Sequence, residues 1–352
     1  MKHLFCLIIN LLNVNAMANC NKLFLDFNKV ITPSNEEMQK MKTSREALEK
    51  KITAKFKDKL NMTVFYYTQG SSAKDMRTII IKEDGTYDAD RGVFLPEKPS
   101  VTAETVQKYI YDAVKDHTSE GAEHRKKCIR VFYKSAYNID FPAYYEVKGE
   151  DHAYMAVKGD GWIKDDPWHM IKWLEKHKDL NGQLLRIIKY LKVWASKCDF
   201  KMPSGIAFAV WAANNYSSKS DRDDESLYET LKNIKSELYW RVSCTSPVEP
   251  FDDLTSKLTQ DQKDKFKKEL DKFVDDAKEA LDEKNQLKSS KIWREYLGGR
   301  FPLGVDEDID AKEKALSLTA TTILSNSAYL NEKGNINPTS GVSHQPHRNY
   351  GG

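Results

Sequence analysis

Three aspartates have the spacing that metal-dependent chemistry requires. Asp88 and Asp90 are separated by one residue in the strand-like segment YDADRGVF. Residues i and i+2 of a strand face the same way with Cα atoms about 6.6 Å apart, so both carboxylates can reach divalent ions about 3.5–4 Å apart. Asp140, in the strand-like NIDFPAYYEV, joins them if the two strands pair at roughly 4.8 Å. Because three close carboxylates repel unless cations lie between them, and hard oxygens suit Mg²⁺ or Mn²⁺, we predict a catalytic site that holds two such ions.

An isolated D-x-D motif occurs often by chance on a solvated strand edge or turn, so its context decides its meaning. Gly70 and Ser71 follow a predicted strand and precede a predicted short helix. A hydroxyl and backbone N–H groups at a helix start form a site that receives phosphate. Only a short strand and turn separate this pair from Asp88, so both can face one cleft.

A basic helix is the third component of the predicted site. Lys189 and Lys192 are three residues apart in LLRIIKYLKVW, so they share a helix face. They are either exposed to solvent, or one of them reaches across the cleft to a triphosphate. Ser204, directly after Pro203, places another hydroxyl at a predicted helix start.

The first half of the chain must position the aspartates, and it predicts a mixed sheet with a few helices. The hydrophobic patterns, Ser/Thr caps and turn residues predict two helices and five strands. The helices are 34–56 and 101–116, and the strands are 62–69, 77–81, 87–94, 129–133 and 138–147. Asp84-Gly85 predicts a turn, and residues 148–166 predict a loop or short hairpin.

The second half is predicted to be helical, over 168–177, 184–194, 205–216, 227–242, 260–284 and 293–297. The fold class is therefore α+β, with a mixed-sheet lobe, a helical lobe and the active site in the cleft between them. The expected domains are an extension over 1–16, the α/β core over 17–167, the helical lobe over 168–305, and a terminal helix with a flexible tail over 306–352.

The composition excludes a protein held on DNA mainly by charge. The chain has 352 residues, with 55 Lys and Arg against 52 Asp and Glu, so its net charge is only +3. Nucleic-acid binding is therefore not indicated. The five cysteines include no C-x-x-C pair, so neither a zinc site nor a disulfide framework is indicated and reduced cytoplasmic thiols are the simplest interpretation.

The apolar segment LFCLIINLLNV near the N-terminus has three interpretations. It is a misassigned start upstream of Met17, a secretory signal, or a structural helix. We prefer the first, because nucleoside triphosphates and Mg²⁺ are cytosolic. The segment is too short for an ordinary membrane span, so no stable membrane insertion is expected.

Together these motifs resemble a known family. GSSAKDMRTII, DADRGVF and NIDFPAYYEV are similar to the GS…D-x-D…D pattern of polymerase-β-like nucleotidyltransferases. More closely, the chain resembles the bacterial cGAS/DncV-like nucleotidyltransferases (CD-NTases, or SMODS synthases) of CBASS anti-phage defence. The resemblance covers about residues 22–302, and the segments that narrow it are LFLDFNKVITPS, GWIKDDPW, LLRIIKYLKVW, MPSGIAF, SPVEPFDDL and KIWREYLGGRFP.

The resemblance implies a two-lobed synthase that joins ATP and other ribonucleoside triphosphates into a cyclic di- or trinucleotide second messenger. By matching positions, Gly70 and Ser71 hold the donor phosphates, and Lys192 and Ser204 contact a triphosphate. Asp88 and Asp90 would bind both metals, and Asp140 would help to activate the acceptor hydroxyl.

The C-terminus suggests a partner. Some members of the family end in an exposed glycine that an E1–E2-type conjugating enzyme joins to a target, and this chain ends Tyr350-Gly351-Gly352. A terminus without side chains enters such an active site easily. Gly352 is therefore either a conjugation terminus or the end of an ordinary frayed tail.

Two other functions stay open. One is a linear nucleotidyltransferase of the oligoadenylate or protein-modifying kind. The other is a nucleotide-binding sensor without turnover, against which the three mutually repelling carboxylates argue, because a sensor has no need to hold them together.

Overall fold

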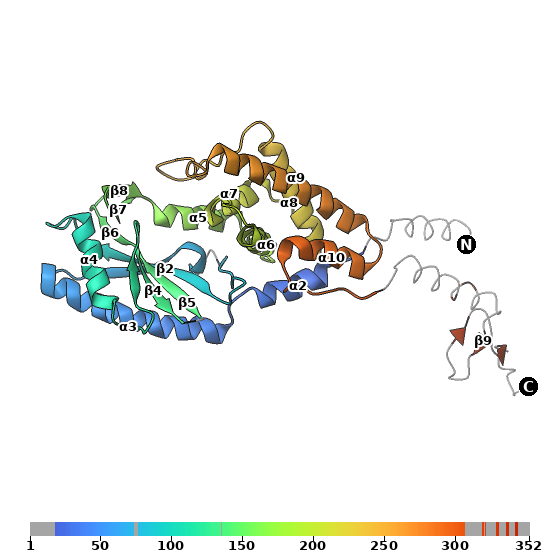
Figure 1. Cartoon of the computed structure of the whole chain (residues 1–352), viewed down its shortest axis with the longest axis horizontal. Helices are drawn as coiled ribbons and strands as arrows, with labels where there is room; N and C mark the ends of the chain where they lie inside the picture. Colours follow the sequence, from blue (N-terminus) through green and yellow to red (C-terminus); the bar gives the residue numbers. More distant parts are fainter. Residues whose placement is uncertain are drawn as a thin grey trace, which may run out of the picture.

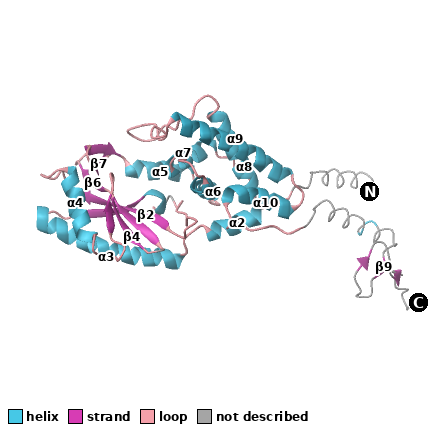
Figure 2. Ribbon diagram, viewed as in Figure 1, coloured by secondary structure: helices cyan, strands magenta, loops and turns pink. Residues whose placement is uncertain are grey.

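The computed structural model describes residues 18–73, 77–134 and 136–306, and the isolated residues 319, 321, 329–330, 336–337 and 342–343. The described chain forms two lobes (Figure 1), a curved sheet flanked by helices and a bundle of helices. This arrangement confirms the predicted α+β class, which Figure 2 shows by element type. The predictions for the extension 1–16 and for Gly352 lie outside the described residues.

One mixed sheet of eight strands forms the first lobe. Its order is β3-β4-β5-β2-β6-β7-β8, with β1 paired to β2. The strands are β1 (Phe65–Gln69), β2 (Tyr87–Leu95), β3 (Ala122–His124), β4 (Ile129–Tyr133), β5 (Tyr137–Phe141), β6 (Ala143–Glu146), β7 (Ala153–Val157) and β8 (Gly161–Asp165). The segment 148–166, predicted as a loop or a short hairpin, contains the β7–β8 hairpin.

Strands β5 and β6 are two parts of the single strand predicted over 138–147. Tyr87 pairs with Tyr137 and Val93 with Ala143, in the same parallel register along both parts. Pro142 lies between them; it has no N–H for a ladder, but its carbonyl accepts from Val93 N at 2.9 Å. The proline therefore divides the strand without changing its register.

Except for Arg91, the odd-numbered residues of β2 and β5 are apolar and buried against two helices. Ala89, Val93 and Leu95 pack in one core with α3 (Asn35–Leu60) and α4 (Ala103–Val114). Ser34 begins α3 in a capping box with Glu37, as its position in the sequence predicts. The even-numbered positions, which include Asp88 and Asp90, thus face the other side of the sheet.

The helical lobe has its own core, built on α6 (Gln183–Lys197). Leu184, Ile187, Ile188, Leu191 and Trp194, the predicted apolar face of this helix, are all buried. Around it lie α2 (Asn21–Val30), α5 (Pro167–His177), α7 (Gly205–Asn215), α8 (Asp223–Glu237), α9 (Gln260–Asp282) and α10 (Gln286–Leu297).

Helix α2 lies in the helical lobe, although the predicted core domain begins at residue 17. Phe24 and Phe27 are fully buried in the core of that lobe. Phe24 contacts the rings of Tyr190 and Trp293 at centroid distances of 5.2 and 5.0 Å. The chain therefore starts in one lobe and crosses to the other before α3, which a division by sequence order does not anticipate.

The strand predicted over 77–81 is wrong. The segment is irregular and joins the lobes: Ile79 packs in the core of the sheet lobe and Ile80 in the core of the helical lobe. Its β-branched residues suit a strand, but Ile81 N donates to Ile31 O at 2.8 Å instead of to a strand partner. The predicted Asp84-Gly85 turn that follows is present, with Gly85 at φ +80°.

Beyond residue 306 the described residues include three two-residue strands, β9 (Tyr329–Leu330), β10 (Ile336–Asn337) and β11 (Val342–Ser343), which pair antiparallel. They fall in the predicted flexible tail, and the described residues of that tail thus include paired strands. Among the helices described, none has the length and hydropathy needed to cross a membrane.

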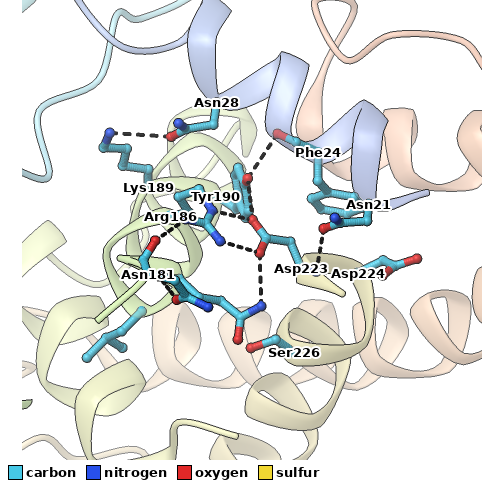
Figure 3. Close-up of polar contacts among 12 residues, drawn as sticks. Asn21, Phe24, Asn28, Asn181, Arg186, Lys189, Tyr190, Asp223, Asp224 and Ser226 are labelled. Atoms are coloured by element: carbon cyan, nitrogen blue, oxygen red, sulfur yellow. Dashed lines mark hydrogen bonds and ion pairs between the residues drawn. The ribbon is translucent and has the colours of Figure 1, made fainter. Parts of the chain in front are cut away.

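A buried carboxylate joins three helices of the helical lobe (Figure 3). Asp223, at the start of α8, is fully buried and accepts hydrogen bonds from Arg186 Nε at 2.6 Å and from Tyr190 Oη at 2.9 Å, both on α6. Its backbone N–H donates to Asn21 Oδ1 on α2 at 2.9 Å. A buried charge with this many partners fixes the position of α2 against α6 and α8.

We predict that Asp223→Ala lowers the free energy of unfolding by about 3–5 kcal/mol, because it leaves Arg186 as an uncompensated, largely buried charge. Urea unfolding followed by circular dichroism measures the change. Asp275→Ala is the control, since its side chain is 75% exposed on α9, and its effect is expected within about 0.5 kcal/mol. Equal effects of the two substitutions would contradict the role given to Asp223.

Candidate active site

Strand register brings the predicted metal ligands into one row across the sheet. Asp90 of β2 pairs with Asp140 of β5 on one side and with Gln69 of β1 on the other. Arg130 of β4 lies opposite Asp140. Side chains in register on neighbouring strands are close on one face, so the predicted pairing of the two aspartate strands is confirmed.

Asp88 is held by three polar neighbours. Its Oδ2 accepts from Lys82 Nζ, and its Oδ1 accepts from Asn138 Nδ2 at 2.9 Å and lies 3.3 Å from Arg130 Nη1. Burial acts to raise the pKa of Asp88, but the hydrogen bonds from Lys82 and Asn138 and the charge of Arg130 lower it below its usual value. Asp88 is therefore a carboxylate at neutral pH.

Asp140 forms a bidentate ion pair with Arg130. Arg130 Nε donates to Oδ1 at 2.7 Å and Nη2 donates to Oδ2 at 2.6 Å. The planar guanidinium suits this geometry. Both oxygens of Asp140 thus have a partner that the sequence did not reveal.

Asp90 differs from the other two aspartates, because no described residue donates a hydrogen bond to its carboxylate. Burial, and then the charges of Asp140 and Asp88, raise the pKa of Asp90 to about 7. An unpartnered carboxylate between two others is an unfavourable arrangement unless a cation binds to it.

Gly70 brings the chain close to Asp90. It starts the 3₁₀ turn η1 (Gly70–Ser72) with φ +59°, and a Cβ placed on it would overlap Asp90 Oδ2. Glycine is thus required here both by conformation and by space. Gly70 and Ser71 are predicted to precede a short helix, but within the described residues both belong to the 3₁₀ turn η1, and Gly70 lies against Asp90.

Lys192 approaches this site from the helical lobe, beside the start of α7 where Ser204 lies. Lys192 Nζ donates to the backbone carbonyl of Thr78 at 2.6 Å; burial lowers the pKa of Lys192 to about 8, although the charge of Asp90 acts to raise it. Ser204 caps α7 and accepts from Ala207 N. A Cβ placed on Gly205 would lie 3.2 Å from Lys192 Cε, so Lys192 packs against the first residue of α7, which directly follows Ser204.

Lys189 is not exposed to solvent, so that alternative is wrong for this residue. It is buried, and its Nζ donates to Thr32 Oγ1 at 2.9 Å and to Asn28 Oδ1 at 3.3 Å. Figure 3 shows the side chain directed to α2. Lys189 therefore connects α6 to α2, because its position on α6 faces the packed N-terminal helix.

A cavity of about 460 Å³ adjoins Asp90 and is lined by residues of both lobes. Gly70, Asp90 and Tyr144 line it from the sheet side, and Met170, Ile206 and Ser246 line it from the helical side. Such a volume and mixed lining are typical of small-molecule sites. The predicted cleft between the lobes is thus present at Asp90.

Sequence reasoning missed the cations and the amide that hold the carboxylates: Lys82, Arg130 and Asn138. The alternation of polar and apolar residues along the strands could have indicated two of them. Arg130 and Asn138 interrupt apolar strands at positions on the same face as the aspartates. Arg91, which received no predicted role, donates to Glu49 Oε1 at 2.7 Å and lies outside this group.

The donor set fits a divalent cation in its chemistry, because Asp90 is an orphaned carboxylate among hard oxygen ligands. As arranged, however, no group of three His, Cys, Asp or Glu side chains within the described ranges is placed to hold a metal ion. Asp140 is engaged with Arg130, and Asp88 with Lys82. Asp88 and Asp140 can therefore bind the ion only after Lys82 and Arg130 move away from their carboxylates.

Comparison with known proteins identifies this part of the chain. Residues 64–144 match the family described as cyclic GMP-AMP synthase DncV-like, nucleotidyltransferase domain. This stretch is therefore similar to a DncV-like nucleotidyltransferase domain. The match contains Gly70 and all three aspartates, so the geometric site and the family's domain coincide.

The similarity extends over the whole two-lobed fold. The apo structure of Vibrio cholerae DncV matches with a TM-score of 0.69 and 16% identity over 81% of this chain and 96% of that one. DncV in complex with the linear intermediate 5′ pppA(3′,5′)pG matches with a TM-score of 0.70 and 15% identity, over 82% of this chain and 97% of that one. The chain has the polymerase-β-like fold of the cGAS/DncV-like nucleotidyltransferases.

One curated relative is a cyclic AMP-AMP-AMP synthase from Acinetobacter sp.. It is 27% identical over 150 residues, which are 40% of this chain and 44% of the relative. The matched region thus spans less than half the length of that relative.

Asp90→Asn is predicted to stabilise the metal-free protein at pH 8 by about 1–3 kcal/mol, because it removes a half-buried charge that two neighbouring carboxylates repel. The sign follows from the raised pKa: a carboxyl at about 7 when folded and about 3.9 when unfolded costs stability increasingly as the pH rises between these values. The advantage of asparagine should therefore shrink as the pH falls from 7 towards 4.

Urea unfolding at several pH values between 5 and 8, with a chelator present, measures this effect. Asp88→Asn is the matched control, since the pKa of Asp88 is lowered, and this substitution should destabilise at pH 8. A gain for Asp90→Asn that is constant with pH would show that charge is not its cause.

Gly70→Ala is predicted to cost about 1–3 kcal/mol more than Gly85→Ala. Both glycines have positive φ, but a Cβ on Gly85 meets no atom within 4 Å, whereas one on Gly70 overlaps the Asp90 carboxylate. The difference between the two variants in the free energy of unfolding, measured with heat and with urea, gives the cost of the close approach of Gly70 to Asp90. Equal losses would mean that only backbone conformation matters at Gly70.

Proposed function

We propose that this protein is a metal-dependent nucleotidyltransferase that joins nucleoside triphosphates into a cyclic di- or trinucleotide. The observation that carries this proposal is the row of Asp90 and Asp140, with Asp88 two residues away on the same strand, beside the Gly70 turn. It lies within the DncV-like domain match, and both DncV and the Acinetobacter relative are named as cyclic nucleotide synthases.

The reaction joins a ribose hydroxyl of one nucleotide to the α-phosphorus of another and releases pyrophosphate. Divalent cations bound at Asp88, Asp90 and Asp140 would supply Lewis-acid polarisation and charge neutralisation. Asp140, which pairs with Asp90 across the β2–β5 ladder, would help to activate the attacking hydroxyl. Gly70 and Ser71 would place the donor phosphates beside Asp90.

The helical lobe would bind the rest of the nucleotide. Lys192 lies against Gly205 at the N-terminus of α7, whose cap is Ser204, an arrangement that receives phosphate. The cavity between the lobes offers apolar walls at Met170 and Ile206 and a hydroxyl at Ser246, which suit a nucleoside. A linear intermediate could turn and bind again in the same cavity for ring closure.

The cellular role that fits this activity is second-messenger synthesis in the cytoplasm for CBASS anti-phage defence. Its support is the family resemblance. A conjugating enzyme of the E1–E2 type acting on Gly352 is a further proposed partner, and it is supported by the sequence of the tail alone.

Incubation with the four ribonucleoside triphosphates and Mg²⁺ or Mn²⁺ should yield a product that resists phosphatase, identified by mass spectrometry. Asp88→Ala with Asp90→Ala should lower product formation at least about 10³-fold, because both metal ligands of β2 are lost. Asp58→Ala, whose side chain is 68% exposed on α3, is the control and should leave the rate unchanged.

The outcomes separate the open alternatives. If all the products are sensitive to phosphatase, the protein is a linear nucleotidyltransferase. Unchanged product formation by the double variant would overturn the metal mechanism, and nucleotide binding without any product would favour a sensor.

A further inference from the structure

The Arg130 guanidinium lies between two carboxylates that the proposed reaction assigns to metal ions. It contacts both oxygens of Asp140, at 2.7 and 2.6 Å, and its Nη1 lies 3.3 Å from Asp88 Oδ1. The three side chains are only 14%, 11% and 28% exposed. Arg130 thus has the position and the sign of charge that a bridging cation would have.

The sheet fixes this position. Arg130 lies opposite Asp140 in the β4–β5 ladder, while its neighbours Ile129 and Val131 are fully buried on the other face. Its backbone cannot move away without breaking that core. Only the side chain can leave the carboxylates, and it is long enough to do so while it remains at the edge of the site.

The other nearby cations are placed differently. Lys82 contacts Asp88 alone from a half-exposed position, and Lys192 donates to the carbonyl of Thr78 across the cleft. Arginine holds a carboxylate with a rigid two-point fork, whereas lysine is a single mobile charge. Among these described cations, Arg130 is the one that engages two of the three aspartates.

We infer that Arg130 is an exchangeable counter-cation of the carboxylate row. It neutralises Asp140 and Asp88 while no metal is bound, and a divalent cation must displace it from these oxygens. The inference rests on the proposed metal site and adds a residue that opposes metal binding in the absence of substrate.

A second consequence concerns the substrate. A displaced guanidinium beside the site is a strong, two-point ligand for phosphate. A nucleoside triphosphate would therefore hold Arg130 away from the aspartates and strengthen metal binding. Metal and triphosphate would bind cooperatively, and the side chain of Arg130 would couple them.

The competing interpretation is that Arg130 only positions Asp140. The two interpretations predict opposite signs. If Arg130 is a competitor, its removal tightens metal binding to the nucleotide-free protein. If it only positions Asp140, its removal disorders a ligand and weakens metal binding.

The experiment is a calorimetric titration of Mn²⁺ into the nucleotide-free protein and into its complex with α,β-methylene-ATP. We expect Arg130→Met to bind Mn²⁺ about three- to tenfold more tightly than the wild type without nucleotide, because the competing charge is gone. The extra affinity that the nucleotide confers should fall by a similar factor. Arg130→Lys, which keeps the charge but not the fork, should lie between the two.

Two controls separate the possible failures. Arg91→Met removes a guanidinium on β2 that pairs with Glu49, and it should leave Mn²⁺ affinity unchanged. Asp88→Asn should weaken Mn²⁺ binding; if it does not, the proposed metal site itself is wrong. If Asp88→Asn weakens binding while Arg130→Met weakens it or leaves it unchanged, only the exchange inference is overturned.

If Arg130→Met does not fold, the Arg130→Lys variant tests the exchange inference in its place. Tighter Mn²⁺ binding with a smaller gain from the nucleotide supports exchange. Affinity equal to the wild type, or lower, overturns it.

Discussion

The mutual repulsion of three carboxylates is the constraint on which the rest of this structure depends. Asp88, Asp90 and Asp140 lie on one face of a sheet, and the raised pKa of Asp90 reflects burial first and then its two neighbours. The fold lowers this cost with its own cations, Lys82 and Arg130, and with the amide of Asn138. Among the described residues the carboxylate of Asp90 has no hydrogen-bond partner, which is why the proposed metal ion is placed there.

The fold carries that cost because the opposite face of the same strands is well packed. Ala89, Val93 and Ile139 alternate with the polar residues and lie in the core under α3 and α4. The apolar side fixes the register, and the register fixes the aspartates. Across the cleft, the Lys192–Thr78 contact and the segment 77–81 join the two lobes directly beside the site.

Local patterns predicted most elements, including the capped helix α3, the aspartate strands and the apolar face of α6. The errors arose where distant parts of the chain compete for the same residues. Residues 77–81 have strand-like composition but are divided between two cores. Lys189 has a position that suits an exposed lysine, yet it is buried because α2 and the residues directly after it, more than 150 residues earlier in the chain, supply Asn28 and Thr32 as its partners.

The sequence by itself determined that Asp88 and Asp90 share a face, that Gly70-Ser71 follows a strand, and that a lysine-bearing helix comes later, because these properties depend on spacing within one element. Only the tertiary structure decided that Asp140 lies beside Asp90, that Arg130 occupies the space next to Asp140 and Asp88, and that Lys189 turns to α2. The reason is physical: cross-strand register and helix packing are set by contacts between residues far apart in the chain, and no local pattern encodes them.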